Sequence, residues 1–164
     1  MSGNSANPAF EFATATRIIF GEGKLAETPA AIEGFGRKVL VVTGRSPTRA
    51  APLLDLLKAF DYEVHCIPGE PTLSDVTEGV RTAAGREVVV AIGGGSAIDA
   101  GKAIAALVTN PGEPLNYLEV IGRGQPLTET PLPFIAIPTT AGTGAEVTRN
   151  AVITCRDRRV KVSL

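Results

Sequence analysis

A glycine-rich run, GGGS at residues 93–96, connects an apolar run to a segment with helical spacing. The first amides of a helix have no partner within the helix and attract anions, and glycine lets a diphosphate approach the backbone closely. The Ser96 hydroxyl could cap the helix or donate to a phosphate oxygen. The run matches neither GxGxxG nor the GK[ST] phosphate loop, so a tight strand-to-helix connection without a ligand stays the alternative.

A second turn of small residues, PTTAGTGAE at 138–146, also follows a short apolar run. Its hydroxyls and amides suit hydrogen bonds to ribose and diphosphate, although a structural turn uses the same groups for its own backbone. Parallel α/β sheets bind ligands beyond the carboxyl ends of their strands. The two turns together therefore favour a dinucleotide site. Asp99 and Lys102, three residues apart on one helix face, form either a solvated ion pair or the lip of that site.

Three strand-and-helix units in tandem must position these turns. Strands are expected at residues 38–43, 62–67, 87–92 and 134–137, and helices at 25–35, 46–60, 72–85 and 96–108. Thr72 and Asp75 have the spacing of a capping box, and Ser46 is an expected N-cap. Residues 11–20 predict a strand or hairpin, and 150–154 with 159–164 predict a final pair. The order indicates an α/β fold: a Rossmann-like, doubly wound, mainly parallel sheet with an N-terminal β-hairpin.

The composition is that of one globular domain, expected to span residues 1–164 with 1–9 disordered. The formal charge of −1 and the lack of a dense basic run make nucleic acid a poor expectation. No run approaches the roughly 20 apolar residues of a membrane span, and the start does not resemble a signal peptide, so we expect a cytoplasmic protein without a membrane partner. Cys66, Cys155 and a single histidine, His65, provide neither a disulfide framework nor a multi-histidine metal site.

The sequence resembles the iron-containing (group III) alcohol dehydrogenases. The resemblance rests on GGGSAIDAGKAIA at 93–105, IPTTAGTGAEVTRNAVIT at 137–154 and RIIFGEGKL at 17–25. It implies a nicotinamide cofactor lying across the sheet. It places the diphosphate near Gly94, Gly95 and Ser96, the nicotinamide half near Thr139, Thr140 and Thr143, and Asn150 and Lys161 close to the cofactor, with Lys161 reaching a ribose hydroxyl.

Two positions depart from the pattern of the family. Many members carry an aspartate for the adenosine ribose where this chain has Gly44 and Arg45. A guanidinium can bind a 2′-phosphate, which favours NADP or mixed use over NAD alone, unless Arg45 points to solvent. Glu70 stands where many relatives have asparagine, and its carboxylate can accept from a ribose hydroxyl but cannot donate to it.

In the family, a helical domain that holds Fe²⁺ or Zn²⁺ follows, and the substrate is an alcohol or aldehyde. The sequence stops inside a predicted strand, so we expect an N-terminal cofactor-binding domain without that metal domain. It should have no catalytic or metal-binding residues of its own and should be inactive alone. A maleylacetate-reductase-like or glycerol-dehydrogenase-like enzyme and a non-catalytic nucleotide-binding or interaction module are the alternatives. The edge at 160–164 could pair with another copy in a homo-oligomer.

Overall fold

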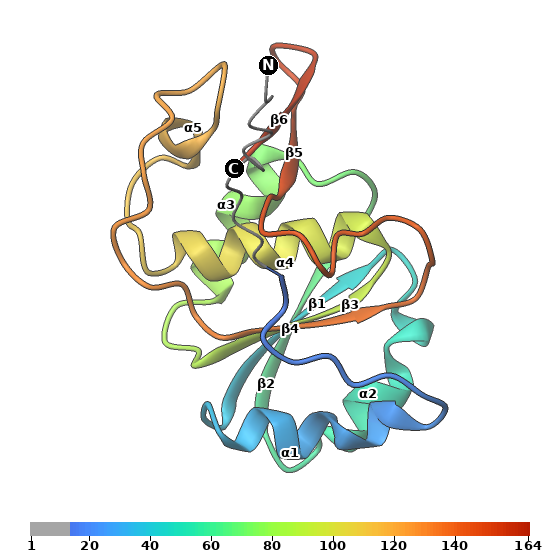
Figure 1. Cartoon of the computed structure of the whole chain (residues 1–164). Helices are drawn as coiled ribbons and strands as arrows, with labels where there is room; N and C mark the ends of the chain where they lie inside the picture. The colour runs from blue at the N-terminus through green and yellow to red at the C-terminus, as the bar shows by residue number, and fades with distance from the viewer. Residues whose placement is uncertain (1–13) are drawn as a thin grey trace, which may run out of the picture.

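The computed structural model describes residues 14–164. Its main sheet has four parallel strands in the order β2-β1-β3-β4, with helices on both faces (Figure 1). The strands are β1 (Lys38–Gly44), β2 (Asp61–Ile67), β3 (Val88–Gly93) and β4 (Phe134–Pro138). The predicted Rossmann-like α/β fold is confirmed. The expected disorder at 1–9 lies outside the described residues.

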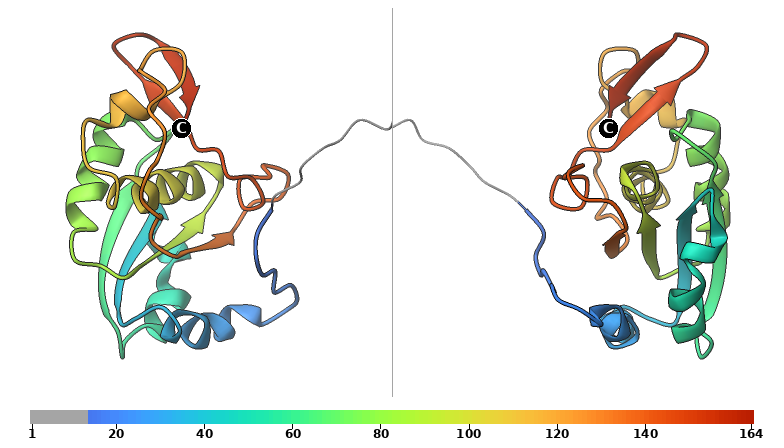
Figure 2. Two further views of the ribbon diagram at one scale, coloured as in Figure 1. Left: turned by 60° about the vertical axis from the view of Figure 1, so that its left-hand side comes forward. Right: turned by 90° about the vertical axis from the view of Figure 1, so that its right-hand side faces the viewer.

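The two central strands divide the core into two layers because alternate side chains point to opposite faces. Leu40 and Val42 of β1 belong to the cluster with α3 (Leu73–Thr82) and α4 (Gly95–Leu107). Val39 and Val41 pack in the other cluster, with α1 (Thr28–Glu33) and α2 (Ala51–Leu56). Figure 2 shows the sheet between these layers. This packing fixes the carboxyl ends of β1, β3 and β4 at one edge.

Helix α4 lies close to the sheet because a glycine faces the strands. A Cβ atom on Gly101 would stand 2.8 Å from both the Ala91 Cβ and the Phe134 ring. The helix begins at Gly95, with the backbone of Gly94 as N-cap, so Ser96 is not the cap. Helix α4 therefore starts directly after β3 and packs against both β3 and β4.

Two predicted helices are shorter than expected, and in both a proline marks the start. Residues 46–60 form a 3₁₀ turn, η2 (Pro47–Arg49), and then α2, which has Pro52 in its first turn. Ser46 is not its N-cap, since its hydroxyl bonds the Thr48 hydroxyl at 2.8 Å. Pro29 likewise begins α1 after η1 (Lys24–Glu27) rather than interrupting a longer helix. A short helix, α5 (Pro114–Tyr117), lies in a region expected to be loop.

The two ends of the described chain differ from each other. The prediction of an N-terminal strand or hairpin is wrong for residues 14–20, which form no strand; residues 11–13 lie outside the described part. Ile18 and Phe20 are exposed there, so the apolar alternation has no surface to cover. The predicted final pair is confirmed as an antiparallel hairpin of β5 (Val152–Cys155) and β6 (Val160–Ser163), which projects beyond the main sheet (Figures 1 and 2). None of the helices in residues 14–164 has the length and apolar character of a bilayer span.

Candidate functional site

The glycine run and the threonine turn touch each other. The Thr139 amide donates to the Gly93 carbonyl at 2.8 Å, which continues the parallel pairing of β3 with β4. A Cβ atom on Gly94 would lie 3.3 Å from the Thr140 Oγ1, and one on Gly95 would lie 3.3 Å from the Thr143 Cβ. The two turns therefore form one continuous surface at the same edge of the sheet.

The N-terminus of α4 lies at the centre of this surface. Gly94 is its N-cap, and no side chain of residues 14–164 caps it. The amides of Ala97 and Ile98 donate to the Gly94 carbonyl, which leaves the preceding amides at the open end of the helix. Unsatisfied amides at a helix N-terminus favour an anion.

One hollow, of about 270 Å³, lies on the β1 side of this terminus; we call it the first hollow. It is lined by Gly44, Arg45, Ser46, Arg49, Ile92, Gly93, Gly94 and Thr139. The Arg45 Nε donates to the Pro68 carbonyl at 2.7 Å, which holds its side chain over the end of β2. Sequence reasoning missed Arg49, although its spacing of four residues from Arg45 was available as a signal. Two guanidinium groups make the first hollow a cationic one.

A second hollow, of about 210 Å³, lies on the hairpin side of the same terminus. It is lined by Glu70, Pro71, Gly95, Ser96, Asp99, Val152, Thr154 and Lys161. The Lys161 Nζ lies 2.5 Å from the Glu70 Oε1. This hydrogen bond from Lys161 lowers the pKa of Glu70 below the usual range of a glutamate. The second hollow thus carries charges of both signs.

Asp99 and Lys102 form an ion pair of 2.9 Å, and they are not solvated. Only 16% of the Asp99 side chain and 10% of the Lys102 side chain are exposed. The Lys102 Nζ also donates to the carbonyls of Thr148 and Asn150. Asp99 faces the second hollow, whereas Lys102 reaches away to the chain that follows the threonine turn.

The remaining predicted site residues are placed as follows. Thr140 and Thr143 are in contact distance of the two central glycines, and the Thr143 Oγ1 lies 3.5 Å from the Glu146 carboxylate. Asn150 lines neither hollow, and its carbonyl is the group that bonds Lys102. The structure therefore brings together all the predicted residues except the Asn150 side chain.

Metal ligands do not gather in the described part of the chain. Residues 14–164 contain no group of three His, Cys, Asp or Glu side chains that could hold an ion. The His65 Nε2 lies 2.9 Å from the Asp75 carbonyl in a largely buried position, a packing role. Cys66 and Cys155 are free thiols. The two hollows are instead lined by backbone groups, hydroxyls and charged side chains of both signs.

In open α/β sheets of this kind, ligands bind in the crevice outside the carboxyl ends of the strands, where the two turns make contact. Residues 15–164 match the model of the iron-containing alcohol dehydrogenase family. The chain belongs to this family, as the motif resemblance implied.

Named relatives agree with this assignment over nearly the whole chain. Alcohol dehydrogenase 4 of Schizosaccharomyces pombe is 37% identical over 98% of this chain and 39% of its own length. NADH-dependent butanol dehydrogenase B of Clostridium acetobutylicum is 34% identical over 93% of this chain and 40% of its own. The solved sulfoacetaldehyde reductase of Bifidobacterium kashiwanohense with NAD⁺ superposes with a TM-score of 0.83 and 30% identity, covering 96% of this chain and 43% of that one. The chain thus spans about two fifths of the length of these relatives.

Proposed function

We propose that this chain binds a nicotinamide dinucleotide and acts as the cofactor-binding part of a metal-dependent alcohol dehydrogenase. The observation that carries the proposal is the contact between the two turns around the uncapped N-terminus of α4, with a hollow on each side. Family membership and the relatives named for alcohol oxidoreduction support it. The substrate in the whole protein is then a small alcohol or aldehyde.

The backbone at the centre of the surface is suited to the diphosphate. Side chains on Gly94 and Gly95 would fill the space against the threonine turn, so glycine keeps the amides open to a bulky anion. The Ser96 hydroxyl lies beside them in the second hollow. We assign the diphosphate to these three residues and the adjoining hydroxyls of Thr139, Thr140 and Thr143 to the nicotinamide half.

The two hollows then take the two sugars. The first hollow receives the adenosine ribose beside Gly44 and Arg45, and the second receives the nicotinamide ribose beside Glu70, Asp99 and Lys161. The guanidinium groups of Arg45 and Arg49 are suited to bind a 2′-phosphate. We therefore propose that the cofactor is NADP, or that NADP and NAD are both used. The neighbour solved with NAD⁺ and the relative named for NADH support a nicotinamide cofactor in general.

The bound nicotinamide ring would supply hydride donation and acceptance. The chain's own residues hold the diphosphate by backbone amides and fix the two riboses, which orients the ring relative to the sheet edge. The described residues hold no ligand set for Fe²⁺ or Zn²⁺, so their proposed role is confined to the cofactor. That the 164-residue chain alone does not turn over an alcohol stays a prediction. Chelator-insensitive NADPH oxidation with an aldehyde would contradict it.

Titration with NADPH and NADH, followed by the fluorescence of the reduced nicotinamide, tests the proposal. A saturable response is expected for both, with the tighter binding for NADPH. A non-catalytic interaction module would give no saturable response. Turnover of glycerol or maleylacetate by the whole protein would instead favour the two related enzyme classes.

The cytoplasmic location and the homo-oligomer both stay predictions. The Glu119 amide donates to the Ser163 carbonyl of β6 at 3.0 Å and so occupies part of the edge that could pair with another copy.

A further inference from the structure

The Lys102 ammonium is surrounded by oxygen atoms from two distant parts of the chain. It contacts the Asp99 Oδ1 at 2.9 Å on its own helix. It also contacts the Thr148 carbonyl at 3.1 Å, the Thr148 Oγ1 at 3.4 Å and the Asn150 carbonyl. An ammonium has three donors, so this set uses its full hydrogen-bonding capacity. Only 10% of the Lys102 side chain is exposed.

The acceptors lie on the segment that connects the threonine turn to the hairpin. Among the described residues, hydrogen bonds from Lys102 and from the Thr14 hydroxyl tie residues 140–150 to the rest of the chain. Lys102 makes three of these hydrogen bonds from a side chain that is only 10% exposed, whereas the Thr14 hydroxyl makes one. Lys102 is therefore the main polar anchor of this segment on α4.

We propose that Lys102 is a positioning residue of the dinucleotide site, an inference that rests on the proposed function. It holds the threonine turn against the glycine run and sets the base of the hairpin that carries Lys161. Through the 2.9 Å ion pair it also directs the Asp99 carboxylate, which lines the second hollow. Lys102 itself lines neither hollow, so it acts through these groups.

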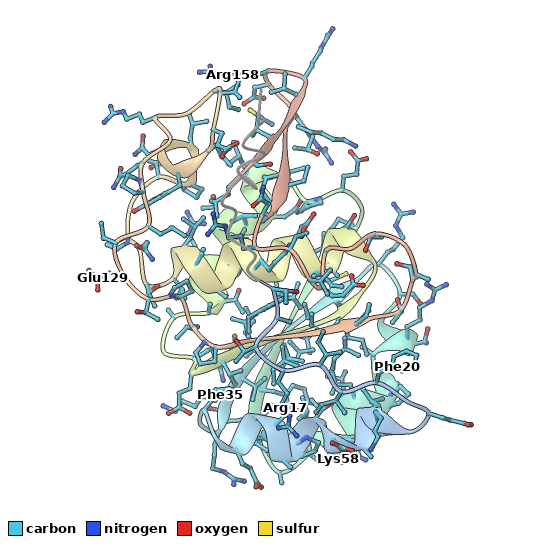
Figure 3. All side chains as sticks on the ribbon, viewed as in Figure 1. Arg17, Phe20, Phe35, Lys58, Glu129 and Arg158 are labelled. Atoms are coloured by element: carbon cyan, nitrogen blue, oxygen red, sulfur yellow. The ribbon has the colours of Figure 1, made fainter. Side chains whose placement is uncertain are left out.

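A second pair in the same chain provides a matched control. Asp55 and Lys58 have the same spacing and the same 2.9 Å separation, but their side chains are 69% and 74% exposed. Figure 3 shows Lys58 at the end of the molecule opposite the β5–β6 hairpin. Exposed pairs contribute little, whereas removing one partner of a buried pair leaves the others without compensation. The two pairs thus have the same spacing and distance and differ in their exposure to water. Comparing them isolates the effect of burial at Lys102.

The test compares Lys102→Met with Lys58→Met in the full 164-residue chain. Hydrogen exchange should become faster at amides within residues 140–154 of Lys102→Met, with no change in β1 and β2. The Kd for NADPH should rise about tenfold or more, while the Kd for 5′-AMP, which lacks the nicotinamide half, should stay within about twofold. Lys58→Met should change neither readout. Lys102→Gln, a neutral side chain that keeps two donors, serves if Lys102→Met does not fold.

The outcomes separate this inference from the proposed function. Unchanged exchange at residues 140–154 overturns the anchor, whether or not nucleotide binds. An equal rise in the Kd of NADPH and of 5′-AMP also overturns it, because a merely structural defect would not distinguish the two ligands. If the unmodified chain shows no saturable NADPH binding, the proposed function fails, and the exchange result alone then decides the anchor.

Discussion

The two hollows beside the N-terminus of α4 are built in different ways. The first is formed by the ends of β1 and β3, which are paired along their length in the core of the sheet, and by the turn after β1. The second joins the loop after β2, the start of α4 and a hairpin about 90 residues further along the chain. Sheet pairing thus shapes the first hollow, while side-chain and backbone ties between distant segments shape the second.

The polar ties of the second hollow differ in strength. The Lys161 and Glu70 side chains are 56% and 59% exposed, so their ion pair is screened by water. The Thr154 amide donates to the Pro71 carbonyl at 2.7 Å, and Lys102 holds the segment before β5. We therefore expect substitutions near the second hollow to disturb the conformation of its lining more readily than substitutions near the first.

The largest effect is expected where the two hollows meet. Gly95→Val places a branched side chain against Thr143, over the amides proposed to bind the diphosphate. The loss of charge-assisted bonds to a diphosphate should weaken NADPH binding by about 100-fold in a fluorescence titration. Gly34→Val is the control, because that glycine has φ −69° and nothing within 4 Å of an added Cβ. Equal NADPH binding by the two variants would contradict the shared site.

A smaller effect is expected in the first hollow alone. Arg45→Asp replaces a guanidinium by a carboxylate that repels a 2′-phosphate. The Kd for NADPH should rise about 10- to 100-fold, while that for NADH rises less, because only NADPH carries the extra phosphate. The ratio of the two constants is the measurement. An unchanged ratio would show that Arg45 does not face the 2′ position.

Two substitutions, one beside each hollow, should change the free energy of unfolding in opposite directions. Thr43 is 1% exposed, and its hydroxyl has no hydrogen-bond partner among the described residues, so Thr43→Val should stabilise the fold by about 1 kcal/mol. Thr72 and Asp75 form a complete capping box, so Thr72→Val should destabilise it by about 1 kcal/mol. Urea unfolding measures both. Destabilisation by Thr43→Val would mean that its hydroxyl is satisfied.

The smallest effect concerns the ion pair across the second hollow. Lys161 lowers the pKa of Glu70, so the pair is intact above the ordinary glutamate pKa of about 4.3 and is lost as the pH falls through the lowered value. Glu70→Gln keeps an acceptor for a ribose hydroxyl and frees Lys161. NADPH binding at pH 7 should tighten by up to about fivefold, and its pH dependence below pH 5 should diminish. Weaker binding would show that the charge of Glu70 is needed.

The sequence allowed the local elements around both hollows to be predicted better than the contacts between distant segments. The apolar runs of β1 and β3 and the turn after each are local signals, and so is the capping box at Thr72. Two of the four Lys102 acceptors are backbone carbonyls 46 and 48 residues away, which have no side-chain signature. Helix α2 stops early because Leu57 leaves helical geometry, although the apolar spacing continues to Phe60. The resemblance located Lys161 and Glu70 but not their bond to each other.

The most direct test of a jointly formed site is to follow backbone amide resonances while NADPH is added. The amides of Gly94, Gly95 and Ser96 and those of residues 139–143 should shift together and saturate at one common Kd. Shifts confined to one of the two turns, or absent from both at saturating NADPH, would contradict the account.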